Sequence, residues 1–306
     1  MIPYVREMKF EYGACDQVSP LIRRVVAKNP GPFTYLGTAT FIVGRGEVAV
    51  IDPGPDQPEH LEALLAALEG ERVTHILVTH HHSDHSPLAR PLQEKTGAKI
   101  YGCAVGGQAA QSTVITEAGH DLGFTPDVGI CGGGAVFEGP GWTLEAIATP
   151  GHTSNHICFA LREENALFSG DHIMGWSTTV VSPPDGDMTA YMDSLEKVKA
   201  RGFDVLWPTH GPPVREVTPF IDAYVAHRRE REAQILGALK AGHTRINDMV
   251  PALYAETDQR LWPAAARSVL GHMIDLTRRG VVATDGDAGP ESEYRLTGEA
   301  ARAPAR

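Results

Sequence analysis

The sequence predicts an α/β fold in which helices cover a sheet. Between residues 38 and 101, apolar runs of strand length alternate with amphipathic segments of helix length. Polar loops that carry His or Asp also follow short strand-like runs at five places: Asp52, His80–His85, His152, Asp171 and His210. A chance His at one strand end is common, but five such ends predict one site built along the rim of a sheet.

The first elements can be assigned only after a segment without a clear pattern. Residues 1–37 are punctuated by Pro and Gly, and no element is predicted there. Residues 38–43 and 47–51 read as two strands joined by a glycine-containing turn. A helix with one leucine-rich face should follow, with Asp56 as its N-cap and Gly70 as its stop.

The next strand leads directly to a histidine-rich loop. Residues 73–79 are predicted to be a buried strand, and Ser86-Pro87 should open a helix that runs to about Lys95. A strand resumes near residue 99. The Gly-rich segment 104–135 is long for a connection, which indicates a loop that borders a site or acts as a flap.

The middle of the chain repeats short strands. Four strands are predicted, at residues 142–149, 157–161, 166–168 and 204–207. Asp187 is expected to cap a helix that buries a Met, Tyr and Leu face.

The character of the sequence changes near residue 220. A charged helix through residues 224–239, helices at 246–254 and 263–279, and a hairpin of 281–284 with 293–296 are expected. Three helices and a hairpin resemble a small winged-helix unit. We therefore predict two domains, residues 1–221 and 222–306.

Composition narrows the classes of function. The chain has 306 residues and a net charge of −11, which leaves no overall attraction for nucleic acid or an anionic membrane. No apolar stretch of transmembrane length occurs, and the N-terminus lacks a signal-peptide pattern. Four dispersed cysteines, Cys15, Cys103, Cys131 and Cys158, are expected to be reduced thiols in a cytoplasmic protein.

The histidine-rich loop is the strongest functional signal. The pattern His-x-His-x-Asp-His supplies the candidate ligands His80, His82, Asp84 and His85 within six positions. Neutral imidazoles with a carboxylate suit zinc, and other divalent transition metals accept the same set. A surface metal-binding tract is the alternative, but this tract is internal and follows a buried strand. Asp52 alone leaves two roles open, a turn-former or an anchor for this loop.

The five segments together resemble the metallo-β-lactamase fold superfamily over roughly residues 30–215. Thr149-Pro150-Gly151-His152-Thr153 and Ser169-Gly170-Asp171 are similar to the hydroxyacylglutathione hydrolase (glyoxalase II) pattern. The resemblance implies a four-layered αβ/βα sandwich: two mixed sheets face each other, helices cover the outside, and the site lies at one edge.

The resemblance also implies a role for each candidate ligand. His80, His82 and His152 would hold a first zinc ion, and Asp84, His85 and His210 a second. Asp171 would bridge the two ions, and Asp52 would orient the histidine loop. Mn²⁺ or Fe²⁺ are possible replacements for the two Zn²⁺. His81, His156 and His172 do not fall at ligand positions and are expected to support the ligands or to be satisfied polar residues.

Such a pair of ions implies a hydrolase that uses a hydroxide shared between the metals, with Asp84 orienting it as a catalytic residue. The expected substrates are small thioesters, esters or lactams. True β-lactamases of this fold usually carry Cys or Ser in place of Asp171, so any β-lactam cleavage should be promiscuous. A single-strand-specific endoribonuclease and a non-enzymatic metal-binding regulator are the alternatives.

The C-terminal segment resembles that of the lactamase-beta-2-type subgroup, which includes endoribonucleases. From Asp222 onward it contains 12 Lys and Arg against 12 Asp and Glu, a net charge of zero. Its candidate recognition helix carries Arg267, Arg278 and Arg279 against Asp275. A nucleic-acid reader needs a denser basic face. We therefore expect a unit that packs on the rim of the site or forms a homodimer, with a small-molecule substrate and no membrane.

Overall fold

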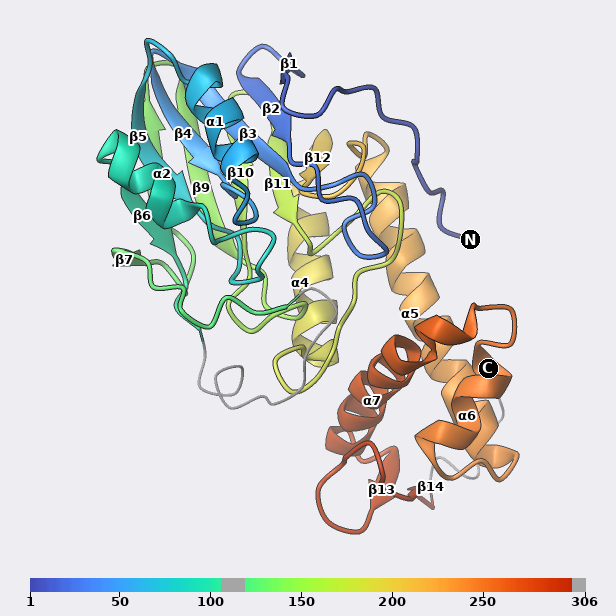
Figure 1. Ribbon diagram of the computed structural model, residues 1–306. Helices are drawn as coiled ribbons and strands as arrows, with labels where there is room; N and C mark the ends of the chain where they lie inside the picture. Colours follow the sequence, from blue (N-terminus) through green and yellow to red (C-terminus); the bar gives the residue numbers. More distant parts are fainter. Residues whose placement is uncertain (106–118, 299–306) are drawn as a thin grey trace.

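The computed structural model describes residues 1–105 and 119–298, and two mixed sheets form its centre (Figure 1). The first sheet has seven strands in chain order. β1 to β4 pair antiparallel, and β4 to β7 pair parallel. The strands are β1 Cys15–Gln17, β2 Ile22–Val26, β3 Ala39–Arg45, β4 Glu47–Ile51, β5 Arg72–Leu77, β6 Lys99–Gly102 and β7 Val128–Gly129.

The second sheet has five strands in the order β12-β11-β10-β9-β8. Its neighbours are antiparallel except β11 and β12, which run parallel. The strands are β8 Val136–Gly139, β9 Trp142–Ala148, β10 Ile157–Leu161, β11 Ala166–Gly170 and β12 Val205–Pro208.

Three apolar clusters hold the layers together. Between the sheets, aromatic and branched side chains such as Phe41, Trp142 and Phe168 form the central core. On the outer face of the seven-stranded sheet pack α1 Pro58–Ala67 and α2 Ala89–Thr96, and on that of the five-stranded sheet pack α4 Met188–Arg201 and α5 Val217–Lys240. This α/β/β/α order, visible in Figure 1, confirms the predicted sandwich.

The C-terminal unit shares α5 with the sandwich. The first half of this helix packs in the core below the five-stranded sheet, and its second half, through Ile235 and Leu239, packs in a separate C-terminal core. The remaining elements are α6 Ile246–Leu253, the 3₁₀ turn η1 Gln259–Leu261, α7 Trp262–Arg278, β13 Val282–Thr284 and β14 Tyr294–Leu296. The predicted helices and hairpin are confirmed. The predicted boundary at 221/222 falls inside α5 and stays a prediction.

Several local expectations need correction. Strands β1 and β2 were not expected, because β2 carries Arg23 and Arg24, which are buried in ion pairs with Glu71 and Asp16. The N-cap of α1 is Gln57 rather than Asp56, and Pro58 supplies the preset first turn.

The expectation of four reduced cysteines is wrong for two of them. Cys103 and Cys131 form a disulfide, whereas Cys15 and Cys158 are free. The two partners lie 28 positions apart, and only the fold brings them together. Of the Gly-rich segment 104–135, residues 106–118 lie outside the described residues. Within the described residues, no helix is long and apolar enough to cross a membrane.

Candidate metal centre

All seven predicted ligands lie together at one edge of the sandwich. The histidine loop follows β5, and the loops after β9, β11 and β12 bring in His152, Asp171 and His210. All seven residues are buried, and the two most exposed, Asp84 and His152, keep 8% of their surface accessible to solvent. The His and Asp residues that follow the predicted strands therefore lie along one edge of the sandwich.

The first group of potential ligand atoms comes from three imidazoles. His80 Nε2 lies 2.9 Å from His82 Nδ1, and His152 Nε2 lies 3.1 Å from the same atom. Asp171 Oδ2 is 3.6 Å from His152 Nε2. These four residues offer ligand atoms that all lie within 4.8 Å of one another, close enough to surround one ion.

The second group combines Asp84, His85 and His210. Asp84 Oδ2 lies 3.0 Å from His210 Nε2 and 3.6 Å from His85 Nε2. Asp171 Oδ1 lies 3.4 Å from His210 Nε2 and 3.6 Å from His85 Nε2. One oxygen of Asp171 thus faces each group, the arrangement that a bridging carboxylate requires.

Four of the five ligand imidazoles make a hydrogen bond through Nδ1, the ring nitrogen that does not face the other ligands. The Nδ1 atoms of His80, His85, His152 and His210 lie 2.6–3.2 Å from oxygen acceptors, namely Thr79 Oγ1, Asp52 Oδ2, Val180 O and Gly37 O respectively. A proton on Nδ1 leaves Nε2 with a free lone pair toward the centre. The surroundings therefore select the tautomer that binds a metal.

Asp52 connects three parts of the site. Its Oδ1 accepts the Thr79 backbone N–H at 2.8 Å, and its Oδ2 accepts from the hydroxyls of Thr79 and Thr209 and from His85 Nδ1 at 2.8–2.9 Å. The residue is fully buried and has a φ of +50°, a backbone conformation that Asp tolerates better than most residues. These contacts fit the anchor role rather than a simple turn.

Two glycines allow the site loops to approach their neighbours. A Cβ on Gly151, whose φ is +143°, would lie 2.3 Å from the Tyr191 backbone, and one on Gly170, whose φ is +51°, would lie 2.6 Å from His156 Nε2. Only glycine fits both the backbone angles and the space. These contacts set the positions of the following residues, His152 and Asp171.

The histidines of the two ligand groups differ in their pKa values. Burial lowers the pKa of His80 and His82 well below the ordinary value, so these imidazoles are neutral. Burial would also lower the pKa of His85, but the nearby carboxylates of Asp84, Asp171 and Asp52 raise it well above that value. Burial opposes ionisation of Asp171, yet His210 and His85 hold its pKa well below the usual range.

Four atoms of these ligands form no hydrogen bond of acceptable geometry within the described residues, namely Asp84 Oδ1, His85 Nε2, Asp171 Oδ1 and His210 Nε2, although His210 Nε2 lies 3.0 Å from Asp84 Oδ2. A buried polar atom left unpaired costs about 1–3 kcal/mol. Divalent metal ions, together with a hydroxide that they would hold near Asp84 Oδ1, would satisfy these atoms, and imidazole with carboxylate is a donor set that suits zinc. The residues present therefore fit a two-metal centre.

Two of the other nearby histidines, His81 and His156, hydrogen-bond to residues around this centre, whereas neither ring nitrogen of His172 has a hydrogen-bond partner within the described residues. The imidazole of His81 contacts Asn155 Oδ1 at 2.9 Å and His120 Nδ1 at 3.0 Å. His156 Nε2 accepts the Asp171 backbone N–H at 3.2 Å. His172 lies outside both groups against the Tyr191 ring, and burial lowers its pKa to about 3.

Sequence reasoning missed one residue at the entrance of the site. His120 lines the same cavity as His82 and His152, and its ring centroid is 5.1 Å from that of His82. Its only signal was its place in the Gly-rich segment expected to border a site.

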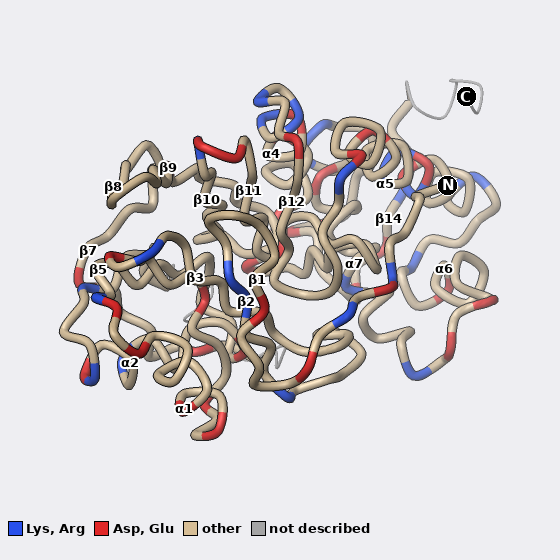
Figure 2. Tube along the Cα trace, turned by 90° about the horizontal axis from the view of Figure 1, so that it is seen from above, with Lys and Arg blue, Asp and Glu red and all other residues tan. Residues whose placement is uncertain are grey.

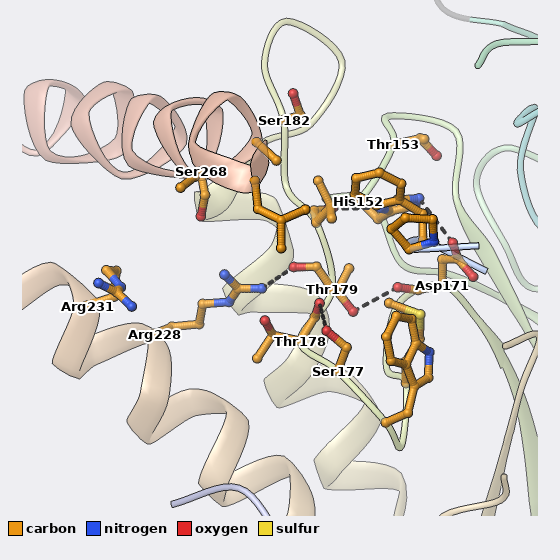
Figure 3. Close-up of a pocket in the computed structure, with 18 of the residues that line it drawn as sticks. His152, Thr153, Asp171, Ser177, Thr178, Thr179, Ser182, Arg228, Arg231 and Ser268 are labelled. Carbon is orange, nitrogen blue, oxygen red and sulfur yellow. Dashed lines mark hydrogen bonds and ion pairs between the residues drawn. The ribbon is translucent and has the colours of Figure 1, made fainter. Parts of the chain in front are cut away.

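A cavity of about 400 Å³ opens beside the centre. His82, His152 and Asp171 lie at one end, and residues of α5 and α7, among them Arg228 and Ser268, form the opposite wall (Figure 3). The C-terminal unit therefore completes the pocket. Its volume is in the range that small ligands occupy in proteins.

The chain matches the metallo-beta-lactamase superfamily over residues 34–210 and the beta-lactamase associated winged helix domain over residues 246–290. It is 33% identical over 279 residues to a beta-lactamase-like protein 2 homolog of Caenorhabditis elegans, which covers 87% of this chain and 88% of that protein. It is 34% identical over 233 residues to the atrochrysone carboxyl ACP thioesterase of Aspergillus fumigatus, with coverage of 74% and 67%.

Solved structures share the fold. A beta-lactamase domain protein from Burkholderia ambifaria superposes with a TM-score of 0.77 at 21% identity, covering 95% of this chain and 96% of that one. A metallo-beta-lactamase family protein from Thermus thermophilus superposes with a TM-score of 0.73 at 21% identity, with coverage of 92% and 100%. The chain belongs to the metallo-beta-lactamase superfamily and is a metal-dependent hydrolase with a C-terminal winged-helix domain.

Proposed function

We propose that the protein is a dinuclear zinc hydrolase of small thioesters, with esters and lactams as weaker substrates. The observation that supports this most is the convergence of seven buried ligands, four of whose atoms form no hydrogen bond of acceptable geometry within the described residues. His80, His82 and His152 would hold one ion, Asp84, His85 and His210 the other, and Asp171 both. Mn²⁺ or Fe²⁺ would fit the same ligands.

Two bound ions supply an ionised water at neutral pH and polarise the substrate carbonyl. The side chains of the protein then have distinct tasks. Asp84 directs Oδ2 toward His210, where it would bind the second ion, and its Oδ1, which has no partner among the described residues, would orient the hydroxide. We therefore assign Asp84 as the catalytic residue and Asp52 as the residue that positions His85 and the histidine loop.

Thioesters are favoured over a polymer substrate for two reasons. The relative from Aspergillus fumigatus is named as an acyl carrier protein thioesterase, and it aligns with 74% of this chain. Side chains of α5 and α7 also line the cavity and narrow the space beside the ligands to about 400 Å³. A pocket of this kind suits an acyl group better than a strand of RNA.

The charge pattern argues against nucleic acid. Figure 2 shows both acidic and basic residues in the C-terminal unit. On α7, Arg278 pairs with Asp187 of the catalytic domain, and Arg279 pairs with Glu232 at 2.6 Å and Asp275 at 3.0 Å. Two of the three arginines that this recognition helix would offer to phosphates, Arg278 and Arg279, are thus neutralised. Packing on the rim of the site is the role we propose for this unit. Self-association remains a prediction.

The test combines metal content with a substrate panel. Purified protein supplemented with zinc should hold about two ions per chain and hydrolyse lactoylglutathione or an N-acetylcysteamine thioester faster than a β-lactam reporter. Asp84→Asn should reduce the rate about 100-fold or more, while Asp193→Asn, an exposed carboxylate on α4, should not. Cleavage of single-stranded RNA alone, or full activity in Asp84→Asn, would reject the proposal.

A further inference from the structure

The wall of the pocket opposite the metal centre carries positive charge. Successive turns of α5 pass this wall, and His227, Arg228 and Arg231 all line the cavity. Arg228 and Arg231 are three positions apart, so they lie on the same face of the helix. Figure 3 shows both side chains extending from α5 on the side of the cavity away from His152 and Asp171.

Arg228 is a buried cation without a carboxylate partner. Its side chain is 4% exposed, Nη2 donates to the backbone oxygen of Thr179, and the guanidinium carbon lies 5.2 Å from the centre of the Tyr191 ring. Nε has no hydrogen-bond partner within the described residues, and no acidic side chain among them pairs with this group. A desolvated charge of this kind is costly unless an anion reaches it.

Arg231 extends the same surface along α5. Nη1 donates to the Leu253 oxygen at 3.0 Å, and the guanidinium lies 4.1 Å from the centre of the Tyr254 ring. These contacts hold the side chain in place. Within the described residues, no carboxylate forms an ion pair with it. Other arginines of the C-terminal unit differ, since Arg245, Arg278 and Arg279 each contact an acidic side chain.

The rest of the cavity lining is mixed. Met174, Leu261 and Ala265 supply apolar surface, whereas Thr178 and Ser268 supply hydroxyls. An extended ligand with its reacting carbonyl near His152 and Asp171 would therefore place an apolar chain here and its far end near α5. The protein has a net charge of −11, so an anionic ligand needs a local cation to bind.

We propose that Arg228 and Arg231 form an anion subsite, and that the substrate carries a carboxylate or phosphate at the end remote from the bond that is cleaved. The identity of the cleaved bond rests on the proposed function, whereas the anion preference does not. Charge-assisted hydrogen bonds contribute about 1.5–3 kcal/mol, which corresponds to roughly 10- to 100-fold in binding.

The first experiment measures binding without turnover. N-acetylcysteamine thioethers with a 4-carboxybutyl chain, its neutral 5-hydroxypentyl analogue or the corresponding phosphonate contain neither a thioester nor an ester bond for the enzyme to hydrolyse. Calorimetric titration of the zinc-loaded protein should show that the carboxylate or the phosphonate binds at least tenfold more tightly than the neutral alcohol. Equal binding of all three would overturn the proposal, and the stronger of the two acids identifies the preferred anion.

Variants separate this subsite from anion binding at the metals. Arg231→Gln should remove most of the preference for the acid, whereas Arg229→Gln, an exposed neighbour outside the cavity, should retain it. Arg228→Lys keeps the charge but changes the donor geometry, so it should weaken the preference less than Arg231→Gln. An unchanged preference in both cavity variants, with melting temperatures that show folded protein, would place the anion at the metals and reject the subsite.

Kinetics with the matching thioesters extend the result. Arg231→Gln should raise KM for the carboxylated thioester about tenfold more than for its methyl ester, with a smaller change in kcat. A protein that binds the acid selectively but hydrolyses no thioester would reject the proposed function and support the subsite. An equal effect on both thioesters would reject the subsite and leave the proposed function standing.

Discussion

Replacing Asp52 with Asn tests whether hydrogen bonds behind the ligands control metal binding. Asn keeps the shape of Asp and one acceptor oxygen, which suits the backbone N–H of Thr79. The other carboxylate oxygen, Oδ2, is replaced by an NH₂ group, which faces His85 Nδ1 at 2.8 Å and the hydroxyls of Thr79 and Thr209. The hydroxyls can rotate to accept, but His85 must move its proton from Nδ1 to Nε2. That tautomer cannot bind a metal through Nε2.

The size of the effect follows from these contacts. Loss of a group that orients a metal ligand typically lowers affinity 10- to 100-fold, or about 1.4–2.8 kcal/mol. The loss of metal affinity should occur mainly at the site formed by Asp84, His85 and His210. Asp52→Ala is a poorer test because it strands four buried donors at about 1–3 kcal/mol each. Even the lower bound, about 4 kcal/mol, is a large share of the stability of a typical domain.

The assay is a zinc titration of metal-free protein in competition with a chromogenic chelator. Wild-type protein should bind two ions tightly, and Asp52→Asn should bind one tightly and one 10- to 100-fold more weakly. Asp56→Asn removes an exposed carboxylate four positions away and should change neither step. Two wild-type affinities in Asp52→Asn, or an equal loss at both steps, would refute the tautomer explanation.

Three further changes test other parts of the structure. Asp171→Asn removes the charge that faces both ligand groups, so bound zinc should fall from two ions toward one and hydrolysis at least 100-fold, as measured by metal analysis and steady-state rates. His60 is buried, and burial lowers its pKa to about 4. The free energy of unfolding should therefore fall as the pH drops from about 6.5 to 4, because the unfolded state binds a proton in this range and the folded state does not. His60→Gln should remove on the order of 3 kcal/mol of this fall, as measured by denaturant titrations at several pH values. Cys103→Ser should lower the free energy of unfolding by about 3–4 kcal/mol in oxidising buffer, and a reductant should abolish the difference from wild type.

The ligands were predictable because each belongs to a short motif at the end of a strand. His80 to His85 are contiguous, and His152, Asp171 and His210 each follow an apolar run that forms a strand of the five-stranded sheet. Periodicity marks most strands and helices and predicts a sheet covered by helices, whereas the four-layered sandwich was implied by the resemblance to the metallo-β-lactamase fold superfamily. Strand β2 was missed because the charges of Arg23 and Arg24 are neutralised by partners distant in the sequence.

Contacts between distant segments could not be predicted in this way. Nothing in the local sequence pairs Cys103 with Cys131, and His120 carries no motif that places it beside His82. The pocket wall is the most informative case. Arg228 sits within a charged helical stretch, where most side chains are solvated, yet it is buried against Thr179 and Tyr191. Only the packing of α5 on the sandwich separates it from its exposed neighbours Arg229 and Glu230.

This packing explains how one metal centre can serve different substrates. The ligands belong to the strand ends of the sandwich, and their geometry depends on hydrogen bonds such as those of Asp52. The opposite wall belongs to α5 and α7, where a substitution changes the pocket without touching a ligand. Because α5 also contributes to both apolar cores, the two walls are fixed relative to each other. Substrate choice should therefore change with residues such as Arg231, while the chemistry stays with Asp84 and Asp171.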